Sequence, residues 1–454
     1  MRLNTVSGSH NSRPGAIVIG AGLAGAAVCE RLCARGWRVD LIEAHVEPAQ
    51  EASGNHAGSF HPLLARDDNR LARLTHAGVR YALAYWRELE AAGHCFSWSA
   101  CGALQLSRDD GKADPVTALS AGRYAPEFAR GVTQSEASDL AGASVTSGGV
   151  FFGAGGWVQP ASLVRAQLAR CAADDAGRLT THFGRAVSAA ARSGNAWELA
   201  DAHGHLIACA PVVVLAGGAS AHLPHLFGQS IWPVESIRGQ LTVLRAGMIN
   251  APRVPVHRDG YVLPQIDGQV VVGATYERAA SQSAQHANRA NIERLGHLLA
   301  APFAAAATSK GNAHATAHAA RTVYAAYAAL EPEARVAYRA VARDRLPVIG
   351  ALPDLREIDA AAVMRAGARL AHLPRMPGVY AAGAYASRGL TWAALGAEVL
   401  ACLLDGTAAP LEAPLLDAID PARFALHALR RGWVASQGAI ESSGAIEINR
   451  LHGA

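Results

Sequence analysis

Residues 16–43, AIVIGAGLAGAAVCERLCARGWRVDLIE, constrain the fold of this chain more than any other segment. An apolar strand runs into the turn Gly20-x-Gly22-x-x-Gly25, an amphipathic helix follows, and a second strand ends in an acid. In such a unit the first glycine permits the tight turn, the second lets the backbone approach a pyrophosphate, and the third lets the helix pack closely. The free N–H groups and positive dipole end of the helix then face the phosphates. The segment therefore predicts a bound adenine dinucleotide.

The acid at the end of the second strand, Glu43, discriminates among dinucleotides. It follows the glycines by about 20 residues, where a carboxylate accepts hydrogen bonds from ribose hydroxyls and repels a 2′-phosphate. FAD or NAD is therefore favoured over NADP.

Composition places the chain among ordinary globular enzymes. Of its 454 residues, 50% are hydrophobic and 17% are charged, which leaves room for two or three structural units around a large core. The formal net charge is +4, and almost all of the positive charge is arginine, since Lys112 and Lys310 are the only lysines. An arginine-rich surface suits anionic partners, although a coding bias explains it as well.

Cysteine usage and hydropathy bear on where the protein works. Seven scattered cysteines without a C-x-x-C pair indicate a reducing compartment, and no metal-ligand spacing occurs. The N-terminus lacks an apolar signal region, and no run of about 18 apolar residues is present. We therefore expect a cytoplasmic protein that holds no metal and does not enter a membrane.

The segments after the first unit predict further strands and helices of the cofactor domain. Residues 70–92 have helical spacing and precede Gly93, a residue suited to a helix C-terminus. A second helix is expected from about Pro160. A hairpin turning at 203–204 leads to a buried strand, 212–216, which ends in paired glycines as a further strand of the cofactor sheet would.

The middle of the chain predicts a second sheet. Residues 97–106 alternate like a strand, and the alternating segments within 234–278 predict an antiparallel sheet. Residues 285–330 are alanine-rich and helical in character. Residues 379–404 then return to a strand, a glycine-rich turn and a long helix whose N-terminus can face a charged group. These observations predict a cofactor domain that is assembled from separated segments of the chain.

Seven strings carry a resemblance to a known family and run through most of residues 15–433: ASGNHAGSFHPLL, SIRGQLT, HRDGYVLPQ, VVVGATYE, YRAVARDRLPVIGALPD, GAYASRGLTWAALGAEVLA and DPARFALHALRRG. The order of the units resembles the D-amino-acid oxidase and glycine oxidase superfamily of FAD enzymes. Within it, the strings are similar to the FAD-dependent oxidoreductase half of the bifunctional tRNA 5-methylaminomethyl-2-thiouridine biosynthesis protein.

The resemblance completes the expected fold class, which is α/β (α+β overall). A Rossmann-type FAD-binding domain is assembled from discontinuous segments, and an antiparallel-sheet substrate domain is interposed. The expected boundaries are 14–95, 151–232 and 336–433 for the FAD-binding domain, 96–150 and 233–335 for the substrate domain, and 434–454 for a peripheral tail.

The resemblance also implies an activity, with FAD as cofactor. The family's flavin half removes the carboxymethyl group from 5-carboxymethylaminomethyl-(2-thio)uridine at the tRNA wobble position, giving 5-aminomethyl-uridine and glyoxylate. A methyltransferase half then methylates the product, and we expect that half to be missing here, so that any methylation comes from a separate protein. The implied partner is tRNA, with no role for DNA.

Two other functions stay open at this point. One is a small-molecule amine or amino-acid oxidase of the glycine or sarcosine type, which needs no basic surface for tRNA. The other is a flavoprotein without catalytic activity that binds tRNA or docks a partner.

Three residues are the candidates for substrate contact. Arg339 matches the arginine that holds the substrate carboxylate in glycine-oxidase-like enzymes, and its planar fork suits a bidentate pair; Arg343 and Arg345 are nearby competitors. Tyr261 matches a position that contributes a hydroxyl, or else packs within its strand. His61 either lines the pocket or is a hydrogen-bonded loop residue, and it stands where the family has an aromatic residue such as tyrosine.

The resemblance also assigns contacts to the cofactor. The start of the last long helix places backbone N–H groups near the N1/C2 carbonyl region of the flavin, where they stabilise the anionic reduced form: Ser387, Arg388, Gly389, Leu390 and Thr391. The polar loop after the first unit contacts ribityl and pyrophosphate oxygens: Ser53, Gly54, Asn55, Ala57 and Gly58. Val187, expected in the strand before the hairpin, meets adenine through its backbone. The remaining candidates are Gly20, Ala21, Gly22, Leu23, Ala24, Gly25, Glu43, Ala44, Ala216, Gly217 and Gly383.

A basic helix near the C-terminus is a candidate for tRNA contact. Arg423, Arg430 and Arg431 lie on an amphipathic stretch that either tracks phosphates or forms a solvated basic face.

Overall fold

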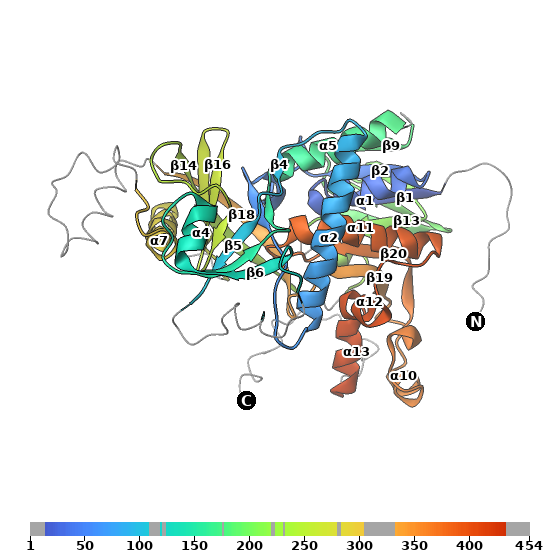
Figure 1. Cartoon of the computed structure of the whole chain (residues 1–454). Helices are drawn as coiled ribbons and strands as arrows, with labels where there is room; N and C mark the ends of the chain where they lie inside the picture. Colours follow the sequence, from blue (N-terminus) through green and yellow to red (C-terminus); the bar gives the residue numbers. More distant parts are fainter. Residues whose placement is uncertain are drawn as a thin grey trace.

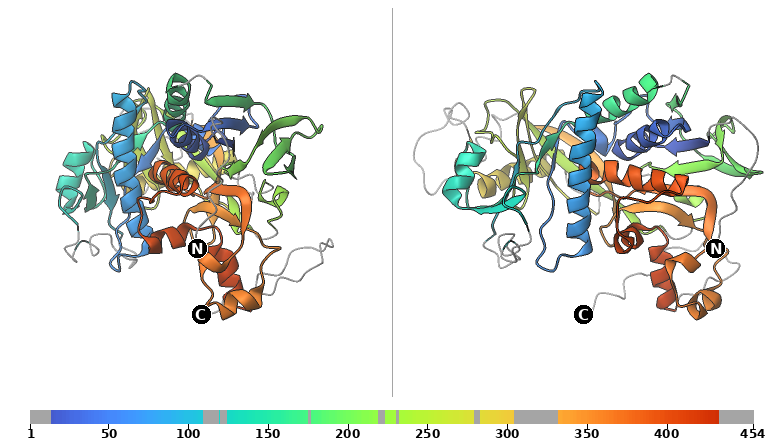
Figure 2. Two further views of the ribbon diagram at one scale, coloured as in Figure 1. Left: turned by 90° about the vertical axis from the view of Figure 1, so that its right-hand side faces the viewer. Right: turned by 45° about the vertical axis from the view of Figure 1, so that its right-hand side comes forward.

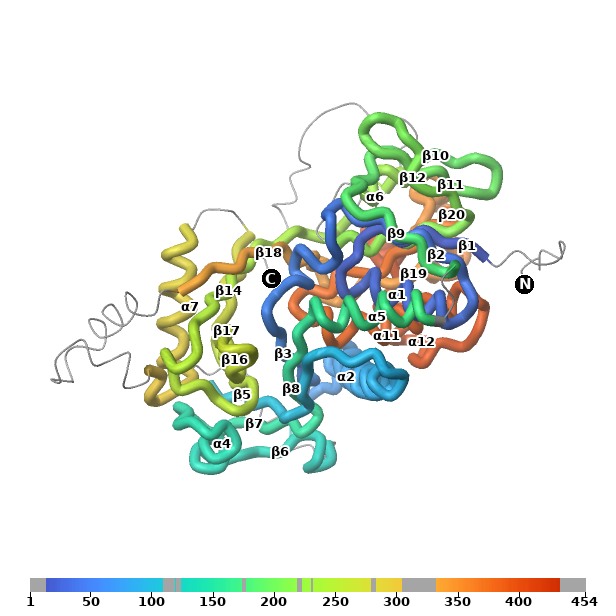
Figure 3. The backbone as a smooth tube through the Cα atoms, turned by 90° about the horizontal axis from the view of Figure 1, so that it is seen from above, coloured from blue at the N-terminus to red at the C-terminus, as the bar shows by residue number. Residues whose placement is uncertain are grey.

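The computed structural model describes residues 14–108, 119, 124–174, 177–218, 223–229, 232–278, 283–303 and 332–432. Two large sheets lie side by side, and a long helix, α2 (Arg70–Ala91), stands between the two halves (Figures 1 and 2). Seen from above, the sheet that carries the N-terminal strand and the sheet that carries α7 occupy opposite ends of the molecule (Figure 3).

The six-stranded sheet is the predicted cofactor sheet. Its order is β19 (Val348–Pro353), β20 (Arg375–Gly383), β13 (Val212–Leu215), β1 (Gly15–Ile19), β2 (Arg38–Glu43) and β9 (Leu179–Phe183). All neighbours pair in parallel except β19 with β20, which pair antiparallel. Strands from distant parts of the chain therefore share one sheet, and their carboxyl ends meet at one edge.

Alternation along β1 builds a core on each face of this sheet. Ala16 and Val18 point into the cluster formed with α1 (Leu23–Ala34), α5 (Pro160–Asp174) and α11 (Gly389–Asp405), while Ile17 and Ile19 point into the opposite cluster. That second cluster is closed by the small sheet β10 (Ala189–Ser193), β11 (Ala196–Ala200) and β12 (Leu206–Ala210) and by α6 (Leu223–Leu226). The predicted hairpin is confirmed, with Gly204 at φ +78° in its turn.

The predicted helix over 70–92 is confirmed as α2. The side chain of Asn69 accepts a hydrogen bond from the Ala72 N–H at 3.1 Å, which satisfies one of the free donors at the helix start. The helix ends at Ala91, and Gly93 adopts φ +86°, a conformation that glycine reaches without strain. Trp86 of α2 and Trp392 of α11 are both almost fully buried where the two helices pack.

The eight-stranded sheet forms the other half of the molecule. Its order is β18 (Glu333–Ala342), β14 (Val234–Arg245), β17 (Gln269–Gly273), β16 (Tyr261–Ile266), β15 (Val256–His257), β5 (Ala103–Leu106), β7 (Gly149–Phe152) and β6 (Ala129–Val132). Its pairs are antiparallel, as predicted for 234–278, except β15 with β5. The helices α7 (Ala284–Leu298) and α4 (Gln134–Ala141) contribute to its core. β18 is an edge strand, and it faces the cofactor half.

Two predictions need correction. Residues 97–106 form two strands, not one: β4 (Trp98–Ser99) joins a small sheet with β8 (Gly156–Val158) and β3 (Gly58–Phe60), and β5 joins the large sheet. The chain changes sheet at Gly102, whose φ of +88° breaks the extended run. Val187 lies in the connection between β9 and β10, outside any strand. Of the alanine-rich segment, α7 is helical, and 304–331 lie outside the described residues, as does the tail 434–454.

The C-terminal part adds a small helical layer made of α10 (Ala360–Arg365), the 3-10 turn Leu370–His372, α12 (Ala413–Ile419) and α13 (Arg423–Arg430). The predicted amphipathic helix is α13, but two of its arginines are used within the molecule. Arg423 donates to Asp344 at 2.8 and 3.0 Å, and Arg430 donates to the carbonyl of Ala368 at 2.7 Å. Among the helices described, none has the length and apolar character needed to cross a membrane.

Candidate active site

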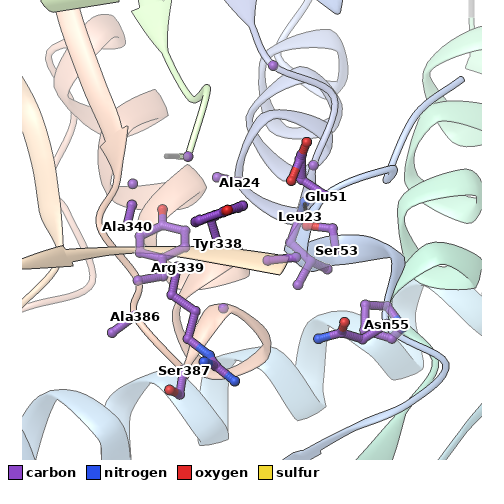
Figure 4. Close-up of a pocket in the computed structure, with 18 of the residues that line it drawn as sticks. Leu23, Ala24, Glu51, Ser53, Asn55, Tyr338, Arg339, Ala340, Ala386 and Ser387 are labelled. Carbon is purple, nitrogen blue, oxygen red and sulfur yellow. Dashed lines mark hydrogen bonds between the residues drawn. The ribbon is translucent and has the colours of Figure 1, made fainter. Parts of the chain in front are cut away.

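A cavity of about 790 Å³ opens where the carboxyl ends of the parallel strands face β18 (Figure 4). Its walls come from the β1–α1 turn, the end of β2, the loop around the 3-10 turn Ala52–Gly54, the end of β13, the β20–α11 loop, and β14, β16 and β18 of the second sheet. Ligands of parallel α/β sheets bind at this edge, because the loops that follow the strands converge there.

The glycine turn has the geometry that its motif predicts. Gly20 adopts φ +107°, and a Cβ on it would lie 2.8 Å from the carbonyl oxygen of Ala216. A Cβ on Gly25 would overlap the carbonyl oxygen of Gly20, so the close packing of helix on strand requires glycine. Gly22 and Gly20 line the cavity, whereas Gly25 lies behind it.

Glu43 is held at the end of β2 by backbone donors. Its Oε2 accepts the N–H of Ala21 at 2.7 Å, and its Oε1 accepts the N–H of His45 at 3.0 Å. A carboxylate has about four acceptor positions, so capacity remains for ribose hydroxyls. Helix α1 begins beside it without a capping side chain at Gly22, and Ser53 Oγ accepts the Leu23 N–H at 3.0 Å.

The loop over 51–58 supplies an observation that tests the fit of a dinucleotide. Asn55 lines the cavity, and its Oδ1 is buried without a hydrogen-bond partner among the residues described. A buried acceptor of this kind costs free energy unless a ligand or water donates to it. Together with the glycine turn, this orphaned acceptor fits FAD, whose ribityl and pyrophosphate region offers hydroxyl donors. The loop is tethered to β18, because Arg335 donates to the carbonyls of Gln50 and Glu51 at 2.6 and 3.1 Å.

The start of α11 forms another wall. Ser387, Gly389 and Leu390 line the cavity together with Gly383 at the end of β20, while Arg388 is the N-cap residue and has no capping hydrogen bond from its side chain. Burial lowers the pKa of the Arg388 guanidinium, and nearby Arg345 lowers it further. The N–H groups at a helix start carry partial positive charge, so this wall favours an anionic flavin.

Arg339 extends from β18 into the pocket (Figure 4). Its Nη1 donates to the carbonyl of Thr275 at 3.3 Å, and its Cζ lies 5.9 Å from the ring centre of Tyr276. No carboxylate of the described residues forms a salt bridge with it, and Arg339 lines the cavity. The competing candidates Arg343 and Arg345 are exposed and do not line the cavity.

Space for this guanidinium depends on a glycine on the neighbouring strand. A Cβ on Gly239 of β14 would overlap Nη1 of Arg339 and lie 2.5 Å from its Cζ. The predicted anchor is therefore positioned by a residue that the sequence motif did not single out.

Tyr261 begins β16 and lines the same end of the cavity. Burial raises the pKa of its hydroxyl, and the nearby Arg339 opposes that rise. The tyrosine is therefore a neutral donor beside the guanidinium.

His61 does not line the cavity. Its Nδ1–H donates to the carbonyl of Pro62 at 2.9 Å, and its ring packs 4.6 Å from His257 and 5.0 Å from Phe152. His257 in turn packs 5.7 Å from Tyr261, which places His61 behind the cavity wall. Burial lowers the pKa of His61 to about 4, with Arg388 contributing in the same direction, so the ring is neutral near pH 7.

Most of the predicted cofactor residues come together on the cavity surface, including Val187. Those that line it are Gly20, Gly22, Leu23, Ala24, Glu43, Ala44, Ser53, Asn55, Ala57, Gly58, Val187, Ala216, Gly217, Gly383, Ser387, Gly389 and Leu390. Those that do not are Ala21, Gly25, Gly54, Arg388 and Thr391. Sequence reasoning missed Tyr276, Tyr338 and Asp259, which also line the cavity. The first of these lies inside the string VVVGATYE, which carried no separate chemical signal.

Comparison with known proteins gives concordant results. A family model described as FAD dependent oxidoreductase matches residues 16–403. The tRNA 5-methylaminomethyl-2-thiouridine biosynthesis bifunctional protein MnmC of Paraburkholderia phytofirmans is 44% identical over 92% of this chain, and that of Burkholderia mallei is 45% identical over 93%. The chain spans 61% of the length of these relatives.

Solved structures share the fold at low sequence identity. Glycine oxidase from Geobacillus kaustophilus superposes with a TM-score of 0.65 at 19% identity, covering 89% of this chain and 98% of its own. Iminodiacetate oxidase from Chelativorans has a TM-score of 0.63 at 21% identity, covering 87% and 97%.

Proposed function

The chain belongs to the family of FAD-dependent oxidoreductases, and on that premise we propose that it removes the carboxymethyl group from 5-carboxymethylaminomethyl-(2-thio)uridine at the wobble position of tRNA. The products are 5-aminomethyl-uridine and glyoxylate. The observation that carries the proposal is the 44–45% identity, over more than nine-tenths of the chain, to proteins named for tRNA 5-methylaminomethyl-2-thiouridine biosynthesis.

FAD is the cofactor of this family, and it supplies an acceptor for a hydride. The residues that would hold it are the glycine turn for the pyrophosphate, Glu43 for the ribose, Asn55 for a hydroxyl of the ribityl chain, and the N-terminus of α11 for the anionic ring. The glycine turn, Glu43 and the start of α11 lie at the end of a strand or the start of a helix, whereas Asn55 follows the 3-10 turn Ala52–Gly54.

Arg339 binds the substrate carboxylate through a bidentate pair. The guanidinium has no competing carboxylate among the described residues, and its one protein acceptor is the Thr275 carbonyl. Tyr261 donates its hydroxyl to the same carboxylate, since burial keeps that hydroxyl protonated. Positioning of this kind supplies much of the rate of an amine oxidation, and no dedicated base is required.

The proposed reaction is oxidation of a secondary amine and hydrolysis of the resulting imine. A hydride leaves the carbon between the nitrogen and the carboxylate, and the amine proton leaves to solvent. The loss of both forms a C=N bond. Water adds to that carbon, and cleavage of the C–N bond gives glyoxylate and the primary amine. Arg339 and Tyr261 bind the carboxylate, and this contact fixes the position of the adjacent reacting carbon in the cavity.

In the experiment, the holoenzyme is mixed anaerobically with tRNA that carries 5-carboxymethylaminomethyl-uridine. The absorbance of the oxidised flavin band is measured over time. We expect the band to be lost with the modified tRNA and not with unmodified tRNA, and glyoxylate to be released. Arg339→Ala removes the anchor, while Arg343→Ala, at an exposed position outside the cavity, is the matched control. Reduction by glycine or sarcosine without reduction by tRNA would instead establish a small-molecule oxidase. Tight tRNA binding without reduction by any amine would establish a flavoprotein that only binds.

The partners and the division of the chain are part of the proposal. The substrate macromolecule is tRNA, and a separate methyltransferase acts on the product. The proposed FAD-binding domain comprises 14–95, 151–232 and 336–433, and the substrate domain comprises 96–150 and 233–335; β18 and β7, both strands of the eight-stranded sheet, cross these bounds. Of the basic stretch near the C-terminus, Arg423 pairs with Asp344, whereas Arg430 and Arg431 are exposed and are the candidates there for tRNA phosphates.

A further inference from the structure

Tyr276 presents an open aromatic ring at the substrate end of the cavity. Its side chain is 49% exposed and lines the cavity, next to the guanidinium of Arg339. Among the described aromatic residues that line the cavity, Tyr338 is comparably exposed, at 44%, whereas Tyr385 is buried. An aromatic ring left open beside an anion-binding group is a feature of sites that bind a planar ligand.

The ring stands on a rigid piece of backbone. The Thr275 N–H donates to the Gln240 carbonyl at 3.1 Å, and Thr275 Oγ1 accepts the Gln240 N–H at 2.9 Å. On the other side, Glu277 and Arg238 exchange two backbone hydrogen bonds of 2.9 and 3.1 Å and a salt bridge of 3.0 Å. Both neighbours of Tyr276 are therefore fixed to β14, and little conformational entropy is lost when a ligand stacks on the ring.

A guanidinium lies beside Tyr276, since the Cζ of Arg339 is 5.9 Å from the ring centre. A ligand that combines a planar ring with an anionic group fits this arrangement. A free amino acid uses only the guanidinium and leaves the ring uncovered.

The spacing suits the proposed substrate. Four bonds separate the carboxylate carbon from C5 of the uracil, so the extended linker spans about 5 Å. A bidentate pair places the carboxylate carbon about 4 Å from the arginine Cζ, and the base therefore begins about 9 Å from Arg339. The ring centre of Tyr276, 5.9 Å from that Cζ, lies within this distance.

We propose that Tyr276 stacks on the wobble uracil while Arg339 binds the carboxylate of the carboxymethylaminomethyl group on that base. The two contacts together would select carboxymethylaminomethyl-uridine. This inference rests on the function proposed above. It makes Tyr276 the residue that distinguishes a modified nucleoside from a simple N-substituted glycine.

The test compares two ligands that share the carboxylate and differ in the base. Holoenzyme is titrated with 5-carboxymethylaminomethyl-uridine or with N-acetylglycine under anaerobic conditions, and binding is followed by the change in the flavin spectrum or by its reduction. For Tyr276→Leu we expect the affinity for the nucleoside to fall about tenfold to a hundredfold, as removal of one stacking ring does. The affinity for N-acetylglycine should change less than threefold or so, since its carboxylate contact is kept.

Two further variants make the result decisive. Tyr276→Phe keeps the ring and should bind both ligands as the wild type does, which separates stacking from any role of the hydroxyl. Val336→Ala is the matched control and should bind both ligands as the wild type does, because Val336 is 37% exposed on β18 but does not line the cavity.

Equal losses for both ligands in Tyr276→Leu would overturn the inference, and so would unchanged nucleoside affinity. Loss of FAD from that variant would also overturn it, by showing that the ring covers the flavin instead. If the wild-type holoenzyme is not reduced by the nucleoside or by modified tRNA, the proposed function itself fails, and that result is visible without any variant.

Discussion

Gly239→Ala should weaken substrate binding without touching either the substrate or the cofactor. The new Cβ would lie 2.5 Å from Cζ and 2.8 Å from Nη2 of Arg339, whereas ordinary contacts lie at about 3.5 to 4 Å, so the guanidinium must recede by about 1 Å or more. The obstacle is the end of a flexible side chain, so the fold itself accommodates the methyl group. A shift of this size breaks one of the two charge-assisted hydrogen bonds of a bidentate pair, which is about 1.5 to 3 kcal/mol, or roughly tenfold to a hundredfold in affinity.

The assay is titration of the holoenzyme with N-acetylglycine, followed in the flavin spectrum, alongside the KM for modified tRNA. Gly296→Ala is the matched control, since a Cβ there meets no atom within 4 Å, and it should leave both quantities unchanged. FAD content and the unfolding temperature of Gly239→Ala should stay at wild-type values. If Gly239→Ala binds N-acetylglycine as tightly as the wild type does, Arg339 is not the carboxylate anchor, or its position is not set by β14.

Three other outcomes follow from the site and its surroundings. Glu43→Gln keeps the shape of the side chain but loses its charge, so the Kd for FAD should rise about tenfold, measured by equilibrium dialysis; an unchanged Kd would contradict its role at the ribose. Gly25→Ala places a methyl group onto the backbone oxygen of Gly20, so the variant should be destabilised by several kcal/mol (about 3 or more) and purify without flavin. Burial lowers the pKa of His61 in the folded state to about 4, so the unfolded chain takes up a proton on this ring at a higher pH than the folded chain does. The contribution of the neutral ring to the free energy of unfolding is therefore complete above about pH 6.5 and is lost as the pH falls toward 4. Urea unfolding at pH 5 and pH 7.5 should therefore differ less in His61→Phe than in the wild type.

The parts of the fold that the sequence predicts best are those where one short segment determines its own geometry. The glycine turn of β1 and α1, the glycine after α2 at position 93 and the turn at Gly204 depend on residues within a few positions of one another, and each has the predicted conformation. The parallel sheet was predictable for the same reason, since a buried strand that ends in glycines is a local signal.

Residues whose role depends on two distant strands could not be found in this way. Gly239 matters only because β14 pairs with β18 in a register that sets Ile237 opposite Arg339 and brings the guanidinium over the neighbouring glycine. His61 follows a loop that resembles a pocket-lining motif, yet its ring turns toward His257 of β15, a contact fixed by the second sheet. The string around Tyr276 reads as an ordinary strand end, and only the assembled cavity reveals that the ring is open.

The edge strand β18 joins the two halves of the site, and this has a consequence for how the cofactor and the substrate anchor are coupled. Near one end, Arg335 donates to the carbonyls of Gln50 and Glu51, just before the loop that carries Asn55. Near the other, Ala340 accepts the Ala386 N–H at 2.9 Å, and Val341 forms a bridge with Tyr385, just before the start of α11. Arg339 lies between these two attachments, so the two loops proposed to hold FAD are both bonded to the strand that carries the proposed anchor. On the proposed function, we therefore expect a shift of either loop to move Arg339 as well, so that cofactor binding and alignment of the carboxylate site are coupled.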